Sequence, residues 1–521
     1  MEYNLPSEIV KDLSFGANAR DEIMQGVTCL TNAVKSTLGA SGRCVIYEDA
    51  RGKPVITKDG VTVAESVVLH QPVKNLGATL IKEAARNTVN EAGDGTTTAT
   101  ILAHAILKES YEHIDKNNIR QIKEGLQSGL SKILRYLDDA TIEVNDSTLE
   151  SVANISCNND KETGAIISSA FKKVGKDGVV LIEDSDTFET TLDIVEGTQL
   201  ECNLTSDYLT TDKDKGIAML DNPYVLIVSS PISSIRKIQS VLEHVIKSGR
   251  SLLIVANVEQ QPKAALVANR VKGNIKVNII DPPGFGPTKE DTIEDLAFLT
   301  GATVINEALG DDLDLIDPSC LGEAIKSVTD AKYTVLQTKD LGVDFAERVE
   351  NVQKKIKKEQ NKFLKQKLEQ RLAMLSGSVG VIKVGANSKV ELKEKRDRVD
   401  DSVHATKAAL KEGIVPGGGI ALLNASQKIN SDNIGEEIIL KAIQEPCKVI
   451  LDNAGLPTTQ ANAKEGTGVN VITGKYVNMI KEGIIDPVLV TKTALKNAVS
   501  VATTVLSADC VISNMRINES S

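Results

Sequence analysis

The stretch NEAGDGTTTATIL, residues 90–102, combines residue types that are unusual at the start of a helix. Three consecutive threonines are poor helix formers, because a β-branched side chain loses χ1 freedom against the preceding turn. The two glycines around Asp94 cost backbone entropy on folding. Stretches with helical periodicity nevertheless stand on both sides. These costs indicate that the segment has a local function.

A helix that begins near Thr96 would present unpaired N–H groups and the positive end of its dipole, and together these form an anion site. Gly93 and Gly95 would let the backbone approach a phosphate closely, and the threonine hydroxyls can donate to phosphate oxygens. Asp94 would repel a bare phosphate but suits Mg²⁺, which favours one or two carboxylates plus phosphate oxygens. The alternative is a helix–turn–helix corner in which the threonines only cap the helix.

The motif is not a Walker A loop. The nearest match to one, GVNVITGKY at 468–476, has one residue too many between its glycines and a tyrosine where Ser or Thr is needed. Three other glycine segments could serve the same nucleotide: TLGASGR at 37–43, KDG at 58–60 and PGGG at 416–419. KDG is equally typical of a hairpin turn, and PGGG of a helix-breaking loop. Spacing alone does not bring these segments together.

The order of the predicted elements is helical, then α/β, then helical again. Helical periodicity is expected at 20–36, at 76–92 with Gly93 as the C′ residue, and on to about residue 140. From about residue 174, short β-rich runs alternate with helices, which indicates an inserted α/β module. The later expected elements are helices at 235–248, 262–272 and 288–300, a charged helical stretch at 343–375, a strand in SVGVIKVG, and helices at 402–412 and over most of 417–521.

Composition excludes several classes of protein. At 521 residues the chain is too long for one core, so two to four domains are expected. Only 3% of residues are aromatic and none is tryptophan, so the core must be aliphatic. A net charge of −11 argues against nucleic acid or an anionic membrane as the main partner. We expect no signal peptide, no membrane span and no structural zinc site, and buried reduced thiols in a cytoplasmic protein.

Together, these segments resemble the group I chaperonins of the GroEL type. The resemblance runs from about residue 12 to residue 512, and it depends on the order and spacing of motifs that are individually modest. The motifs are the TLG turn, ITKDGVTVA, AGDGTTTAT, KVGKDGVVLIED, VEGTQ, PGFG, LTGATVI, VIKVGA, RVDDSVHAT, EGIVPGGGIAL and GIIDP.

The resemblance implies a multidomain α+β fold. A mostly α-helical equatorial ATP-binding domain would comprise 1–140 and 412–521, and a small α/β intermediate domain 141–195 and 379–411. An inserted α/β apical domain, 196–378, would bind clients and a co-chaperonin. The activity implied is ATP hydrolysis coupled to protein folding.

The resemblance also implies a homo-oligomer, a seven-membered ring, single or double. The ring would enclose unfolded protein clients under a small co-chaperonin lid, with no nucleic acid or membrane partner. Residues 506–514, LSADCVISN, are expected to supply an edge strand to the neighbouring subunit.

Carried over residue by residue, the resemblance implies a site for ATP, Mg²⁺ and K⁺. Asp59 would lie near the attacking water, Asp401 would position that water, and Asp94 would bind Mg²⁺. The remaining nucleotide contacts would be Thr37, Leu38, Gly39, Lys58, Gly95, Thr96, Thr97, Thr98, Gly418, Asn470 and Asp486. K⁺ would be held by the carbonyls of Thr37 and Lys58 and by the Thr97 hydroxyl.

The chain departs from the family most on the apical surface that is expected to bind clients. The positions that match this surface are Leu204, Tyr208, Leu209, Gln239, Leu242, Lys263, Val267 and Ala268. Two of them are polar, and two aromatic positions of the family are now leucine. Neutral drift of an exposed surface and a narrowed client range both explain these changes.

Smaller departures lie in the TLG turn and at the expected hinges. Ala40 and Ser41 replace a proline and a lysine, so the turn is expected to be looser. Glu143 and Ser378 stand where the family has a hinge proline and a hinge glycine. A divergent paralogue with a narrowed client range or a non-folding role is the alternative function, although the retained carboxylates favour an ATP-driven chamber.

Overall fold

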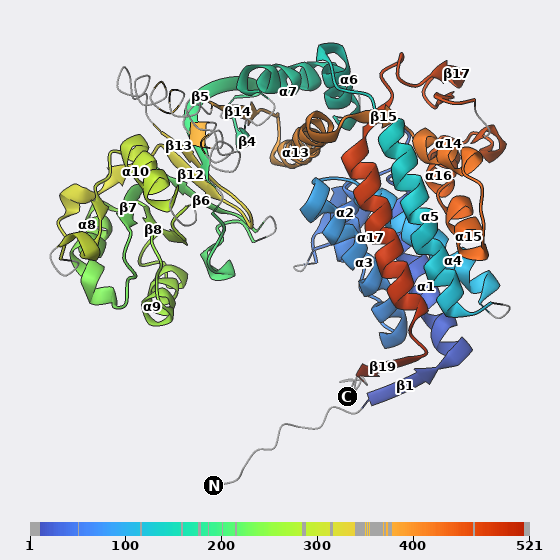
Figure 1. Cartoon of the computed structure of the whole chain (residues 1–521), viewed down its shortest axis with the longest axis horizontal. Coiled ribbons are helices and arrows are strands. Elements are labelled where there is room, and N and C mark those ends of the chain that lie inside the picture. Colours follow the sequence, from blue (N-terminus) through green and yellow to red (C-terminus); the bar gives the residue numbers. More distant parts are fainter. Residues whose placement is uncertain are drawn as a thin grey trace, which may run out of the picture. The chain divides into compact units, whose positions relative to one another are not determined.

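The fold is that of a computed structural model (Figure 1). It describes residues 11–514, apart from 50–51, 115–116, 158–159, 176–178, 186, 201, 214–215, 284–287, 313–315, 462–463 and most of 339–377. The helical stretch expected at 343–375 therefore lies almost entirely outside the described residues.

The chain divides into two compact units. The first, here the helical unit, is 1–169, 184–190 and 384–521, and the second, the α/β unit, is 170–183 and 191–383. The expected insertion of an α/β module between two helical regions is thus confirmed. The finer division into three domains stays a prediction, because the expected intermediate segments are shared between the two units.

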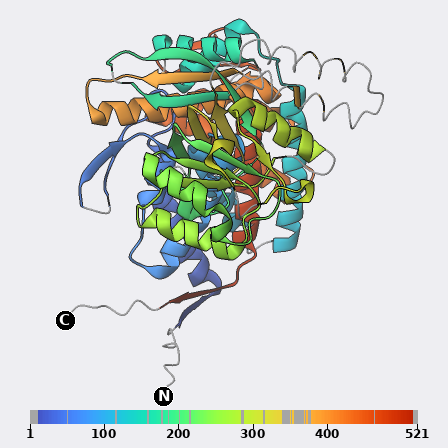
Figure 2. The ribbon, with the colours of Figure 1, turned by 90° about the vertical axis from the view of Figure 1, so that its left-hand side faces the viewer.

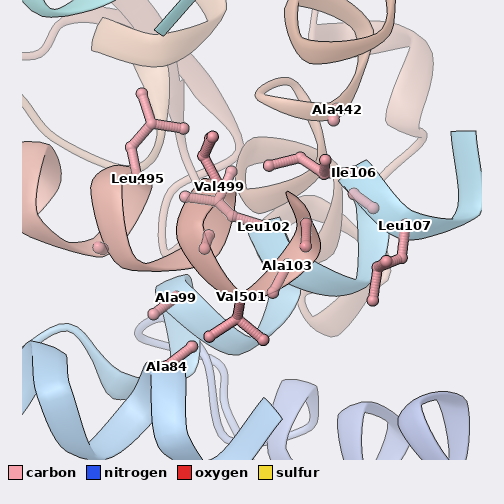
Figure 3. Close-up of a cluster of buried hydrophobic side chains, with 14 of the residues drawn as sticks. Ala84, Ala99, Leu102, Ala103, Ile106, Leu107, Ala442, Leu495, Val499 and Val501 are labelled. Atoms are coloured by element: carbon pink, nitrogen blue, oxygen red, sulfur yellow. The ribbon is translucent and has the colours of Figure 1, made fainter. Parts of the chain in front are cut away.

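Six long helices form the main core of the helical unit. They are α1 (Gly16–Lys35), α3 (Pro72–Ala92), α4 (Thr96–His113), α5 (Ile119–Asp139), α15 (Ile434–Ala442) and α17 (Val488–Leu506). Their apolar faces bury only Val, Leu, Ile and Ala, as the low aromatic content predicts. Figure 3 shows Leu102 and Ile106 of α4 packed among Leu495 and Val499 of α17. Helical periodicity predicted α1 and α3, although each begins four residues earlier than expected.

The helical unit contains a second group of elements. Its helices are α2 (Gly60–Ser66), α6 (Asp146–Ser156), α13 (Lys389–Glu412), α14 (Ile420–Lys428) and α16 (Glu445–Asn453), and α7 (Lys161–Val174) is shared between the two units. Strand β15 (Ile414–Pro416) pairs antiparallel with β18 (Ile485–Pro487), and β16 (Thr467–Asn470) forms a hairpin with β17 (Lys475–Asn478). A second hairpin joins β2 (Val45–Glu48) to β3 (Pro54–Thr57).

The two ends of the described chain pair with each other. Strand β1 (Lys11–Phe15) runs antiparallel to β19 (Cys510–Asn514), and the two strands lie side by side in Figures 1 and 2. Residues 510–514 therefore do form the expected strand, but its partner in this chain is β1. Leu13, Phe15 and Ile512 remain at least half exposed on this ribbon.

The α/β unit contains two sheets. In the first, parallel strands follow the order β10 (Val304–Ile305), β7 (Tyr224–Val228), β8 (Leu252–Val255) and β9 (Val277–Ile280), with β11 (Gly322–Glu323) antiparallel to β7. The second sheet has the order β4 (Val179–Asp184), β14 (Ser378–Val384), β5 (Thr191–Leu200), β13 (Thr334–Gln337), β12 (Lys326–Thr329) and β6 (Ala218–Asp221).

Strand alternation determines which helices cover each face of the parallel sheet. Leu226 and Ile254 pack with α8 (Gln239–Ser248) and α9 (Gln260–Val271). The alternate residues, including Ile227 and Leu253, pack with α10 (Thr288–Thr300). Helix α8 connects β7 to β8, and α9 connects β8 to β9. Because these strands are parallel, α8 and α9 run in the same direction on one face of the sheet.

Two local expectations were wrong. Lys58-Asp59-Gly60 is not a hairpin turn: the β2–β3 turn comes earlier, and Asp59 is the N-cap of α2. The β-branched run Val61-Thr62-Val63 hides this short helix, which is stabilised by burial of Val63 and Ala64 in the core. Of the seven cysteines expected to be buried thiols, all are free, but Cys29 and Cys44 are exposed.

Candidate nucleotide-binding site

The GDGTTT segment forms a tight corner between α3 and α4. Gly93 ends α3 with φ 76° and Gly95 is the N-cap of α4 with φ 97°, so both are left-handed. No side chain caps α4, and the first backbone bond of that helix runs from the Ala99 N–H to the Gly95 carbonyl. The threonines therefore do not cap the helix, and the N–H groups of its first turn remain available to an anion.

Both glycines are also needed because other helices press on the corner. A Cβ atom on Gly93 would lie 2.6 Å from the Cβ, Cγ and Nδ1 atoms of His404 on α13. A Cβ atom on Gly95 would lie 2.7 Å from Cγ1 of Val490 on α17. Residues from the second half of the chain thus close around the corner, which carries Asp94.

The KDG segment meets the start of α4 directly. A Cβ atom on Gly60 would lie 2.2 Å from Oγ1 of Thr97, so only glycine allows this approach. The Asp59 carboxylate accepts from the N–H of Val61 at 3.0 Å and from the N–H of Thr62 at 2.8 Å. The first turns of α2 and α4 therefore converge, with Asp59 held firmly between them.

The PGGG segment is tied to Asp486. Val415 of β15 pairs with Asp486 of β18, and the backbone N–H groups of Gly418 and Gly419 act on the Asp486 carboxylate to lower its pKa. Gly418 and Gly419 have φ values of 66° and 75°, which let both N–H groups turn toward one acceptor. The loop is thus a small anion-binding turn whose present acceptor is a carboxylate.

Four aspartates influence one another across these segments. Burial raises the pKa of Asp401 well above its usual range, and the charges of Asp94 and Asp59 raise it further. Burial and Asp59 also raise the pKa of Asp94, against the opposing effects of the Gly95 N–H and His404. Burial, followed by the charge of Asp94, raises the pKa of Asp486 to about 7, against the donated N–H groups. Such a cluster favours a cation.

The donor set fits Mg²⁺ bound together with phosphate. Among the described residues, no group of three or more His, Cys, Asp or Glu side chains could hold a metal ion by itself. Mg²⁺ does not need one, because it commonly takes one or two carboxylates and completes its shell with phosphate oxygens and water. Asp94, beside the free N–H groups of α4, provides that carboxylate.

The TLG turn is fixed by α16. The Asn453 side chain donates to the carbonyls of Lys35 and Leu38, each at 2.9 Å. Gly39 adopts φ 84°, and a Cβ atom there would lie 3.3 Å from the side chain of Ile450. Thr37 is buried and its hydroxyl donates to the Val34 carbonyl at 2.9 Å.

Asn470 and Lys58 lie in settings that the sequence did not predict. The Asn470 side-chain oxygen accepts from the N–H of Ile472 at 3.0 Å, so it stabilises its own hairpin turn. Met479, which follows β17, would lie 3.2 Å from a Cβ atom on Gly418, and it links that hairpin to the PGGG segment. Burial lowers the pKa of Lys58, which follows strand β3.

His404 and Val490, which contact the glycines of the corner, were not predicted from the sequence. His404 lies within the quoted RVDDSVHAT motif, one helical turn after Asp401. That spacing was the available signal, because residues three apart on a helix share a face. Nothing in the sequence around Val490 indicated its contact with Gly95.

The residues expected to bind clients all lie in the α/β unit, but they are not equally exposed. Tyr208 is 71% exposed, and Gln239 and Ala268 are also exposed. Leu204, Leu242, Lys263 and Val267 are half-buried. Leu209 is completely buried in the core beneath α8 and α9, so it differs from expectation and offers no surface while this packing holds.

Two apolar residues on the same helices are exposed although they were not predicted. Ile246, near the end of α8, is 54% exposed, and Val271, the last residue of α9, is 65% exposed. Gln239 and Lys263 instead belong to the first turns of these helices. Since α8 and α9 run in the same direction, polar groups mark one end of this helix face and apolar groups the other.

Among the described residues, the helices are too short or too polar to span a bilayer. The model of the TCP-1/cpn60 chaperonin family matches residues 30–516. The chain is also similar to the crystal structure of the chaperonin gp146 from bacteriophage EL 2 (Pseudomonas aeruginosa), determined in the presence of ATP-BeFx.

In crystal form II of that chaperonin, the two chains are 20% identical with a TM-score of 0.70, and the match covers 96% of this chain and 98% of the other. In crystal form I the TM-score is 0.64 at 20% identity, with 97% and 99% covered. Similarity at this level of identity establishes a shared fold over nearly the whole of both chains.

Proposed function

The chain belongs to the TCP-1/cpn60 chaperonin family, and on that premise we propose that it hydrolyses ATP at the site around Asp94 to drive protein folding. The observation that carries the proposal is the convergence of two helix starts, α2 and α4, on one cluster of aspartates. A phosphate chain needs donors and a cation, and this corner provides unpaired N–H groups beside a carboxylate.

Each part of the site has a distinct task in this mechanism. The N–H groups of Thr96, Thr97 and Thr98 bind phosphate oxygens, and Asp94 would hold Mg²⁺, which neutralises phosphate charge when bound. Asp59 and Asp401 orient the attacking water as carboxylates. Thr37, Leu38 and Gly39 lie along the nucleotide. The ribose and base are contacted by Gly418, Asn470 and Asp486. Phosphoryl transfer demands mainly positioning and charge neutralisation, so no covalent intermediate with the protein is required.

The raised pKa of Asp401 has a direct consequence in this scheme. Burial and the charges of the neighbouring aspartates raise the pKa of Asp401, so both oppose ionisation of its carboxyl group. Binding of a divalent cation nearby favours the ionised carboxylate, because opposite charge stabilises it. A cation held by Asp94 would therefore lower the pKa of Asp401 and favour the carboxylate form that orients water.

We also propose the finer properties that follow from the family. They are a homo-oligomeric ring of seven subunits, a small co-chaperonin lid, a K⁺ ion held by Thr37, Lys58 and Thr97, and a cytoplasmic location. The crystals of the similar phage chaperonin grown with ATP-BeFx support nucleotide binding by this fold. We also propose a narrowed client range, because two positions of the expected client surface are polar. Gln239 is exposed in the first turn of α8, and Lys263 is half-buried in the first turn of α9.

The test compares three alanine variants in binding and in turnover. Asp94→Ala should lose Mg²⁺-dependent ATP binding, measured by titration calorimetry with and without Mg²⁺. Asp401→Ala should still bind Mg·ATP but release phosphate about 10²-fold more slowly or worse, the range expected for a positioned acid or base.

Asp397→Ala is the matched control, because it removes the same charge one helical turn before Asp401. It should bind ATP and turn it over nearly as the unaltered protein does. Full activity in both Asp94→Ala and Asp401→Ala would remove this site assignment.

A further inference from the structure

We infer that His404 is a positioning residue for ATP hydrolysis, and that its contact with the bare Cα of Gly93 sets where Asp401 points. The inference depends on the proposed ATPase function. It concerns a residue that touches neither the reacting atoms nor, in this scheme, the nucleotide.

The contact is close and specific. Three atoms of His404, Cβ, Cγ and Nδ1, would each lie 2.6 Å from a Cβ atom on Gly93. Real side-chain carbons do not come so close, so the imidazole occupies the volume that any other residue at position 93 would need. Gly93 has φ 76°, and it immediately precedes Asp94.

The face of α13 that carries His404 is the one turned toward the corner. Asp401 lies one turn before His404, and its pKa is affected by the charges of Asp94 and Asp59. Ala408, one turn after His404, packs with Ala92 at the end of α3 and with Val490. Asp401, His404 and Ala408 therefore form one stripe along the helix.

An adjoining side of α13 is held independently by α6. The buried Ser402 hydroxyl donates to the carbonyl of Ala153 on α6 at 2.9 Å. Ala405 and Ala409 pack with Val152 of the same helix. With one side anchored to α6, the contact on Gly93 fixes the rotation of α13 about its own axis, and hence the direction of the Asp401 carboxylate.

The contact is one of packing rather than of hydrogen bonding. The nearest carboxylate oxygen to Nε2 of His404, Oδ1 of Asp400, is 3.7 Å away, which is too long for a hydrogen bond. The side chain is 51% exposed, and the partner at the contact is a glycine Cα with no side chain. A flat ring of similar width should therefore replace the imidazole.

The test uses three substitutions of His404 with two readouts, the turnover number and the KM for ATP. His404→Ala removes the contact and should lower the turnover number about tenfold or more, since small misplacements of catalytic groups have effects of this size. The KM for ATP and the binding of Mg·ATP should change by less than about threefold. His404→Phe keeps a flat ring and should retain most of the turnover.

His404→Asn keeps Cβ, Cγ and one δ atom, the three positions that meet Gly93, so it should also retain most of the turnover. If His404→Asn is active and His404→Phe is not, the imidazole acts through its nitrogen atoms and the inference is overturned. The comparison of Phe with Asn remains decisive even if His404→Ala does not fold.

A double-mutant cycle with Gly93→Ala tests the contact itself. Gly93→Ala alone should lower turnover more than it does in a His404→Ala background, because two of the three clashing atoms, Cγ and Nδ1, are then absent. Equal effects in both backgrounds would show that the two residues do not interact. If Asp401→Ala keeps full turnover, the proposed site fails; if Asp401→Ala is slow and His404→Ala is not, only this inference fails.

Discussion

The nucleotide corner of the helical unit and the exposed face of α8 and α9 in the α/β unit are built on opposite principles. At the corner, backbone N–H groups and glycines are proposed to bind the nucleotide, and each glycine is in contact with a neighbouring helix. On the helix face, side chains are proposed to bind clients; Ile246 and Val271 there, and Tyr208 before α8, are more than half exposed. Phosphate recognition is directional, whereas the capture of apolar segments depends mainly on area.

This difference predicts that the corner tolerates few substitutions. Few residue types fit a left-handed backbone position that packs against a neighbouring helix. Most substitutions at these glycines are therefore expected to be unfavourable. Apolar area can instead be lost at one point of a helix face and supplied at another. Gln239 and Lys263 remove apolar surface from the first turns of α8 and α9, while Ile246 and Val271 offer it toward the other end.

The largest expected effect is on ATP binding, and it is tested by comparing two glycines, Gly95 and Gly273, that both have a positive φ. Gly95 has φ 97° and Val490 beside it, whereas Gly273 in the α/β unit has φ 77° and nothing within 4 Å. Gly95→Ala should abolish ATP binding, measured by calorimetry, because the added carbon would lie 2.7 Å from Val490. Gly273→Ala is the matched control, and should cost only about 1 kcal/mol of folding stability from backbone strain.

ATP binding by Gly95→Ala equal to that of Gly273→Ala would show that the close packing of the corner is dispensable. The corner would then resemble the helix face, where single substitutions are expected to shift affinity rather than to abolish it.

The next prediction concerns assembly, which is the other role of an exposed apolar surface in this chain. Deleting 509–521 removes β19 and leaves β1 without its partner, so the ribbon that exposes Leu13 and Ile512 is lost. Native mass spectrometry should then detect monomers where the full chain forms rings. Deleting 515–521 alone is the control and should leave rings intact. Full rings in the longer deletion would contradict a role for this ribbon in assembly.

Client capture should change in opposite directions at the two ends of the α8 and α9 face. The double variant Gln239→Leu/Lys263→Leu should bind a panel of denatured proteins more tightly, because a buried leucine contributes roughly 1.5–3 kcal/mol. The double variant Ile246→Ser/Val271→Ser should bind them more weakly. Lys247→Ala, an exposed change on α8, is the control.

The affinities can be measured by fluorescence anisotropy at two salt concentrations, and the leucine variant should show the weaker salt dependence. If the leucines change nothing and the unaltered protein captures the whole panel tightly, Gln239 and Lys263 represent neutral drift.

The sequence predicted a region well where the backbone conformation restricts the residue types, and less well where tertiary burial decides the structure. The corner was predicted well, down to the left-handed Gly93, because glycines and threonines have few other uses there. KDG was misassigned because β-branched Val61 and Val63 hide a helix that exists through tertiary burial. Leu209 was wrongly assigned to the client-binding surface. The sequence shows that the residue is apolar, but it does not show which side of the short segment Asp207–Leu209 faces the core.

The smallest expected effect is on the stability of the helical unit. Glu436 is almost fully buried in the helical unit, where it accepts from Lys132 at 2.7 Å and from Ser128 at 2.6 Å. Burial alone would raise the pKa of Glu436, but these donors and the Asp432 N–H lower it to about 2. A lowered pKa contributes stability above the unfolded value of 4.5, and this stability is lost as the pH falls toward 2.

Glu436→Gln should therefore lower the free energy of unfolding at pH 7 by about 1–3 kcal/mol, the range for a hydrogen bond to a charged group. The difference from the unaltered protein should shrink between pH 4.5 and pH 2. Thermal unfolding followed by circular dichroism measures this, and a difference that does not depend on pH would contradict the role given to the ionised carboxylate.

The most direct single measurement is the yield of a denatured client enzyme refolded with ATP, by the unaltered protein and by Asp401→Ala in parallel. An ATP-driven chaperonin with its hydrolytic carboxylate at Asp401 should raise the yield of active enzyme only when ATP is present. Asp401→Ala should capture the same client but return little active enzyme. Equal ATP-dependent yields from both proteins would contradict the proposal that hydrolysis at this site drives folding.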